Sequence, residues 1–98
     1  MSVESVLSAN NNQLTICIDG RFDFELAQEF RSTYTNRQGL EYTIDMRSTE
    51  HMDSSALGML LNMRKTLGND TKISIINCRP QIKKILTISR FDKKFDIE

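Results

Sequence analysis

The sequence predicts a single α/β domain spanning residues 1–98, with a mixed β-sheet of about four to five strands and about three α-helices mainly on one face. Ninety-eight residues are too few for two ordinary domains. Hydrophobic residues make up 39% and charged residues 27%, the composition of a folded soluble domain. Along the sequence, segments in which apolar and polar residues alternate are followed by segments in which apolar residues recur every three or four positions. This order is typical of strands joined by crossover helices.

Two strands are predicted near the N-terminus. In the second, three apolar residues alternate with polar ones, as in a strand with one buried face: Leu14, Ile16 and Ile18. The polar run at 10–12 predicts a turn, so residues 3–7 are expected to pair with this strand as a hairpin. Gly20 is expected to end the second strand.

The first helix is predicted over residues 24–36, where apolar residues recur every three or four positions: Leu26, Ala27, Phe30 and Tyr34. Asp23 stands where its side chain can accept the first free amide hydrogens of this helix. Gly39 then closes the segment. A central strand follows over residues 42–47, in which apolar positions again alternate with polar ones.

The second half of the chain predicts two further helices and two further strands. Residues 54–67 have helical apolar spacing, with Asp53 as the N-cap. Residues 72–77 form a strand, and residues 80–88 form a helix that begins with a proline. Residues 91–97 finish the chain as a short edge strand or a packed tail. The predicted order is β-β-α-β-α-β-α-β.

The charge balance argues against nucleic-acid and membrane partners. Thirteen basic and thirteen acidic residues give a net charge of zero, so there is no long-range field to attract a polyanion. The C-terminal third is mildly basic, but Lys83 and Lys84 lie among apolar residues as on the solvated face of an amphipathic helix. No apolar run approaches the roughly 18 residues of a membrane span, and the N-terminus lacks signal-peptide features, so we expect a cytoplasmic protein.

Catalytic and metal-binding sets are not predicted. His51 is the single histidine and is too close in sequence to Asp53 and Ser54 for a triad, whose members come from separate elements. Cys17 and Cys78 fall inside predicted strands with no metal-ligand spacing, so we expect reduced core thiols. The four glycines stand singly, which leaves no phosphate-binding loop. We therefore expect no enzyme activity, no metal and no cofactor.

The segment from His51 to Gly58 stands out because two adjacent hydroxyls, Ser54 and Ser55, follow an acid in the first turn of a helix. Helix capping alone explains such a cluster, since Asp and Ser satisfy unpaired amides. A phosphate on Ser54 would add about −1.5 to −2 charges at the positive end of this helix. The dipole and the free amides there favour an anion, so we expect the fold to survive such a modification.

Residues 52–58, preceded by the strand at 42–47, resemble the phosphorylation segment of anti-sigma factor antagonists, which are bacterial domains of the STAS family. Residues 20–23 are similar to that family's Gly-x-Leu/Phe-Asp entry into its first helix, and residues 80–86 to its Pro-x-Val-x-x-Leu helix. The resemblance implies that Ser54 is phosphorylated by a partner serine kinase of the anti-sigma factor type. It also implies that a PP2C-type phosphatase removes the phosphate. Ser55 matches the next position, which is not the usual acceptor.

These implications predict a phosphorylation-switched interaction module that acts in signal transduction and transcription regulation. The unphosphorylated form binds the partner, and phosphate on Ser54 disrupts the complex. Partner contacts are expected at six further residues, of which Met52, Leu57 and Gly58 are expected to be exposed: Asp23, Met52, Asp53, Ser55, Leu57 and Gly58. Leu57 is explained equally well as a core residue. The alternative function is a STAS-like ligand sensor, or a scaffold subunit of a larger signalling assembly.

Overall fold

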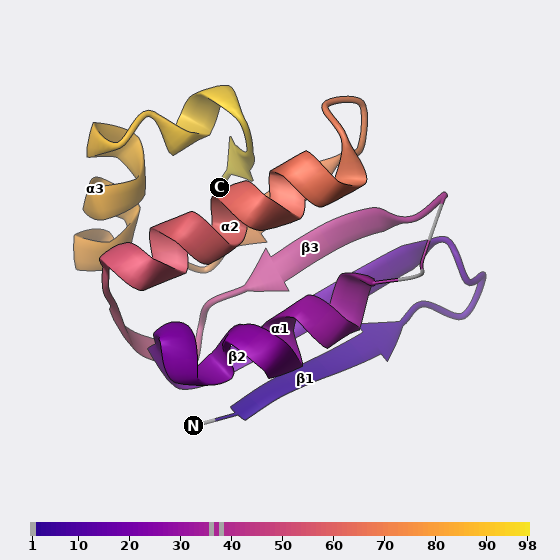
Figure 1. The fold of residues 1–98 in the computed structure, drawn as a ribbon, viewed down its shortest axis with the longest axis horizontal. Coiled ribbons are helices and arrows are strands. Elements are labelled where there is room, and N and C mark those ends of the chain that lie inside the picture. The colour runs from indigo at the N-terminus through magenta and orange to yellow at the C-terminus, as the bar shows by residue number, and fades with distance from the viewer. Residues whose placement is uncertain (1, 36, 38) are drawn as a thin grey trace.

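The computed structural model describes residues 2–35, 37 and 39–98. The helices and the first three strands are labelled in Figure 1, and the order along the chain is as follows. They are β1 (Ser2–Leu7), β2 (Gln13–Phe22), α1 (Ala27–Tyr34), β3 (Glu41–Asp45), β4 (Thr49–Met52), α2 (Ser54–Leu67), β5 (Ile73–Ile76), α3 (Pro80–Ile88) and β6 (Asp96–Ile97). Two short 3-10 turns, Phe24–Leu26 and Phe91–Lys93, precede α1 and β6.

The strands form one mixed sheet in the order β1-β2-β3-β5-β6, with β4 also paired to β2. The pair β1 and β2 is an antiparallel hairpin, and all other pairs are parallel. β2 does not end at Gly20 as expected. It continues to Phe22, because Gly20 takes a positive φ of 86° at a register shift. The first part of β2 therefore pairs with β3 and its last residues pair with β4.

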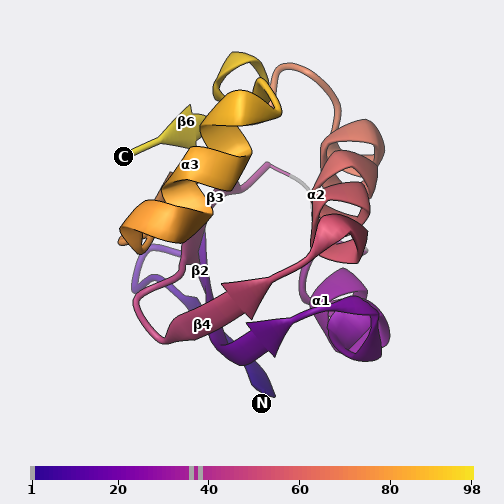
Figure 2. The same cartoon turned by 90° about the vertical axis from the view of Figure 1, so that its left-hand side faces the viewer.

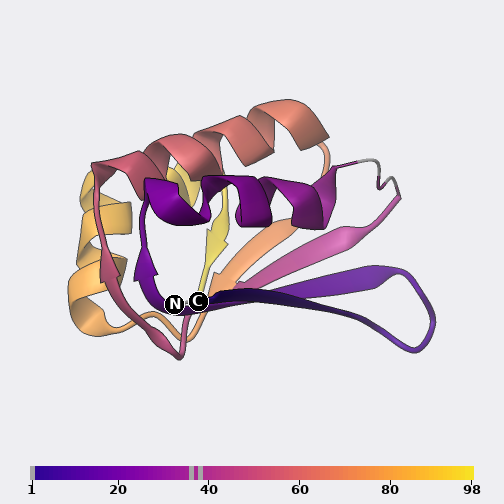
Figure 3. The ribbon, with the colours of Figure 1, turned by 60° about the horizontal axis from the view of Figure 1, so that its bottom comes forward.

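Helices α1 and α2 lie side by side over one face of the sheet (Figure 3). The residues of β2 that point to this face are fully buried, among them Leu14, Ile16 and Ile18. They join the apolar sides of the helices, such as Phe30 of α1 and Leu60 of α2, in a single core. The predicted fold class and the placement of helices mainly on one face are confirmed.

The first helix is shorter than predicted. Residues 24–26 form a 3-10 turn in which Asp23 accepts a hydrogen bond from the amide of Glu25 at 3.0 Å, and the α-helical part begins at Ala27. As described, α1 ends at Tyr34, whereas the predicted end at Asn36 lies outside the described residues. The 3-10 turn also places Phe24 in solvent, with 69% of its surface exposed.

The cysteines are free, but they are half-buried and do not belong to the core. Cys17 lies in β2 on the face opposite the helices, because it alternates with the buried Ile16 and Ile18. Cys78 lies in the loop after β5, so its prediction as a strand residue is wrong. The strand ends at Ile76 because Asn77 takes a positive φ of 60°.

Candidate functional site

The first turn of α2 is organised by the carboxylate of Asp53. The residue is extended, and its Oδ1 accepts hydrogen bonds from the amides of Ser55 at 3.0 Å and Ala56 at 3.2 Å. The same oxygen accepts the Ser55 hydroxyl at 2.5 Å. The Ser55 hydroxyl, followed by the two amides, lowers the pKa of Asp53 below its ordinary value. Asp53 is therefore an ionised N-cap at neutral pH, as predicted from the sequence.

The two adjacent serines differ in what their hydroxyls do. Ser55 is half-buried, and its hydroxyl is held by Asp53. Ser54 is exposed at the first position of α2, and its hydroxyl has no hydrogen-bond partner among the described residues. A group added to Ser54 breaks no existing interaction, whereas a group added to Ser55 would break the bond to the N-cap.

The loop before α1 comes close to this turn because β2 and β4 end side by side, each leading into a helix (Figure 2). Their register places Arg21 opposite His51 and Phe22 opposite Met52. A small hollow of about 30 Å³ lies where the two strands end, and it is lined by Arg21, Phe22, Asp23, His51, Met52 and Asp53. The Nε atom of Arg21 lies 3.9 Å from the Oδ2 atom of Asp23. The structure thus brings Asp23 and Asp53 to one site from separate elements.

Of the three predicted exposed contacts, Gly58 is exposed and Leu57 is half-buried against the core. Met52 is only 7% exposed, so the prediction that it is exposed is wrong, whereas its part in partner binding stays a prediction. It ends β4 beside Phe22, and this pairing turns its side chain into the core. Sequence reasoning missed β4, which would have placed Met52 correctly.

A groove between α1 and α2 runs from this turn past Gly58. It has a volume of about 270 Å³, and its lining includes Ala27, Arg31, Ser55, Gly58, Met59 and Asn62. A Cβ atom added at Gly58 would meet no other atom within 4 Å. Neither a positive φ nor a close intramolecular contact therefore explains a glycine in the middle of this helix. A lone glycine inside the helical pattern was the sequence signal that could have indicated this groove.

The model of the STAS domain family matches residues 5–98 of the chain. The chain belongs to the STAS domain family. A STAS-domain containing protein of Pseudomonas aeruginosa strain UCBPP-PA14 is 44% identical over 103 residues, covering 99% of each chain. The earlier resemblance of residues 20–23, 52–58 and 80–86 to STAS domains is thereby confirmed at the level of the family.

Solved structures of anti-sigma factor antagonists share the fold of this STAS domain. The unphosphorylated form of SpoIIAA superposes with a TM-score of 0.75 at 16% identity, covering 99% of this chain and 87% of SpoIIAA. An anti-sigma factor antagonist from Mycobacterium paratuberculosis gives 0.79 at 18% identity, covering 98% and 85%. The strand-loop-helix context of Ser54 therefore lies in an architecture found in antagonists of this class.

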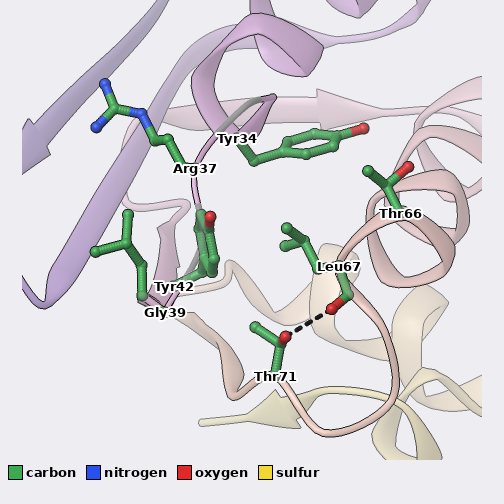
Figure 4. A pocket seen from close by; sticks show the side chains of 8 residues that line it. Tyr34, Arg37, Gly39, Tyr42, Thr66, Leu67 and Thr71 are labelled. Carbon is green, nitrogen blue, oxygen red and sulfur yellow. Dashed lines mark hydrogen bonds between the residues drawn. The ribbon is translucent and has the colours of Figure 1, made fainter.

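A second hollow lies at the opposite end of the STAS domain, near the C-terminal ends of α1 and α2 (Figure 4). It encloses about 350 Å³ beside the rings of Tyr34 and Tyr42. Both rings are 2% exposed, and the buried hydroxyl of Tyr42 has no hydrogen-bond partner among the described residues. Burial raises the pKa of Tyr42 above its ordinary value, so this hydroxyl is protonated and able to donate.

Residues 2–35, 37 and 39–98 form the described part of the chain. That part of the chain contains no group of three or more His, Cys, Asp or Glu side chains arranged to hold a metal ion. It also contains no helix with the length and apolar character needed to cross a membrane.

Proposed function

We propose that this STAS domain is a non-catalytic interaction module of the anti-sigma factor antagonist kind, switched by phosphate on Ser54. Its partner is a regulator of the serine kinase and anti-sigma factor type, and a PP2C-type phosphatase restores binding. The observation that carries the proposal is the exposed Ser54 hydroxyl, which has no hydrogen-bond partner in the described part of the chain, beside a neighbouring hydroxyl held by Asp53. The switch operates in the cytoplasm, where a kinase has ATP, and acts on transcription through the partner.

The capping geometry changes how a phosphate acts at this position. Asp53 already occupies the amides of Ser55 and Ala56, so those donors are not free for an anion on Ser54. The capping bonds stay in place when Ser54 is modified, which leaves the fold intact. The phosphate adds about −1.5 to −2 charges next to an ionised carboxylate, and the surface at the start of α2 becomes strongly negative.

A partner that packs against the unmodified surface must desolvate this added charge. A penalty of about 2.7 kcal/mol lowers affinity roughly a hundredfold, and burial of an uncompensated charge costs at least that much. Arg21 and His51 are the basic side chains beside Asp53, and Arg21 forms a long ion pair with Asp23, with 3.9 Å between its Nε atom and Oδ2. A partner with acidic groups at this contact is repelled most.

The groove between α1 and α2 extends the proposed contact surface beyond Ser54. Ser55 lines the groove at the end nearest the switch, and Gly58 lies one turn further along α2. Glycine in a helix interior costs about 0.8–1 kcal/mol relative to alanine. A close approach of the partner's backbone or side chain at Gly58 explains why this cost is tolerated.

The proposal is tested by phosphosite mapping and binding with three variants. The kinase-type partner is isolated with the unmodified domain, then incubated with ATP and each variant. We expect one added phosphate on the wild type and on Ser55→Ala, and none on Ser54→Ala. Ser54→Ala should hold the partner as tightly as the unmodified protein, and Ser54→Asp should hold it more weakly. Phosphate on Ser55 of the wild-type domain would overturn the assignment.

A ligand sensor is the alternative function, favoured by the hollow at Tyr34 and Tyr42. Its volume of about 350 Å³ is sufficient for a small organic molecule, and the Tyr42 hydroxyl offers a buried donor. A thermal shift on adding a metabolite, lost in Tyr42→Phe while Ser54 remains unmodified, would support this alternative over the switch.

A further inference from the structure

The face of the sheet opposite α1 and α2 carries no helix among the described elements (Figure 3). Strands β2, β3, β5 and β6 are parallel neighbours in this sheet. Parallel strands occur almost only where both faces are covered, because crossover helices normally occupy each side. This uncovered face is therefore a candidate surface for another protein.

The strand register shows which residues this face carries. Glu4, Cys17 and Asp45 lie opposite one another on β1, β2 and β3. Asp19 and Glu41 are on the same face of β2 and β3, and Asp96 lies opposite Ser74 on β5. Five acids lie on this face: Glu4, Asp19, Glu41, Asp45 and Asp96. Among the described residues of these strands, Arg21 near the end of β2 is the one base that the same alternation places there. We call this surface the acidic sheet face.

The acidic sheet face has a concave centre. A trough of about 370 Å³ runs across β2, β3 and β5 over small or half-buried residues, including Thr15, Thr43, Ser74 and Ile76. Glu41 and Glu98 border the trough, and Lys72 is the one base in its lining. Arg47, just after β3, is held by Asp45 with a Nε to Oδ2 distance of 3.2 Å.

We propose that the acidic sheet face binds a partner protein through a surface rich in lysine and arginine. The charge is opposite to that of such a surface, and the trough gives its side chains a place to enter. A second copy of this chain that docked through the same face would present the same acids and be repelled, and nucleic acid would be repelled because of its phosphates. This site is separate from Ser54, since α2 covers the other face, and the proposal does not depend on phosphorylation.

The test uses octalysine peptide as a defined cationic probe at low salt, with amide chemical shifts recorded across the whole chain. We expect shifts concentrated on β1, β2, β3 and β5, and an affinity that falls as salt is added. The triple variant Glu4→Gln, Asp19→Asn, Glu41→Gln should bind about tenfold or more weakly. All three side chains lie on the surface, so the fold should be retained, which the spectrum itself verifies.

A matched triple variant removes the same charge elsewhere: Glu29→Gln, Asp70→Asn, Asp92→Asn, all of them exposed. It should bind octalysine within about twofold of the wild type, and so should Ser54→Asp. Shifts centred on other elements, or an equal loss in the matched variant, would overturn the proposal. Binding of octaglutamate or a short DNA duplex to this face, or self-association through it, would also overturn it. None of these outcomes bears on whether Ser54 is the phosphorylated residue.

Discussion

Gly58→Ala is expected to make the free domain more stable and its complex with the proposed kinase-type partner weaker. Alanine in a helix interior is favoured over glycine by about 0.8–1 kcal/mol. The added Cβ meets no atom within 4 Å, so no clash reduces this gain. For a domain of this length, 1 kcal/mol raises the melting temperature by about 4–8 °C.

The complex should respond in the opposite direction. The new methyl group lies on the wall of the groove where we propose that the partner docks, and overpacking of a close contact costs about 1–3 kcal/mol. Affinity should therefore fall by about five- to 150-fold. Calorimetric melting of the free domain and titration of the partner into it measure the two effects separately.

Thr66→Ala provides the matched control, because it is an exposed position of the same helix outside this groove. It also gains helix propensity and should raise the melting temperature, but it should leave partner affinity unchanged. If Gly58→Ala destabilised the free domain, α2 itself would require the glycine. If both variants kept full affinity, the groove would have no part in binding.

Three further predictions concern the scaffold. Burial alone would raise the pKa of Asp45, but hydrogen bonds from Asn77 and Arg47 outweigh burial and lower that pKa from 3.8. The ionised carboxylate therefore stabilises the fold fully above pH 3.8, and this stabilisation is lost as the pH falls through the lower pKa of the folded state. Urea unfolding should become easier below about pH 4, and this pH effect should be smaller in Asp45→Asn. Arg64→Leu leaves the carbonyls of Gly68, Thr71 and Lys94 without their donor, and should lower the free energy of unfolding by about 2–4 kcal/mol in the same assay. Tyr42→Phe removes a buried hydroxyl that has no hydrogen-bond partner among the described residues, and urea unfolding should show stability unchanged or higher. A large loss of stability would contradict this expectation.

The sequence was informative where structure depends on local patterns. The bounds of α2, residues 54–67, were predicted from helical spacing between an N-cap acid and Gly68, both of which act within one turn. In contrast, β4 was missed because its buried residues, Thr49 and Met52, stand three apart rather than alternating. The strand exists because it pairs with the end of β2, and pairing between distant segments leaves no local signature.

The candidate site shows the same division. The choice of Ser54 over Ser55 came from the family resemblance, and the sequence alone could not distinguish the two hydroxyls. The distinction became physical only when the structure placed the Ser55 hydroxyl on the Asp53 carboxylate. The acidic sheet face could not be predicted from the sequence either, because a net charge of zero does not indicate which charged side chains share one face of the sheet.

The central claim is that a phosphate on Ser54 controls partner binding while the fold stays the same. Its most direct test is the dissociation constant of the kinase-type partner for the unmodified domain and for the domain phosphorylated at Ser54. We predict an affinity about a hundredfold lower for the phosphorylated form, with an unchanged circular dichroism spectrum. Equal affinities for the two forms would contradict the account.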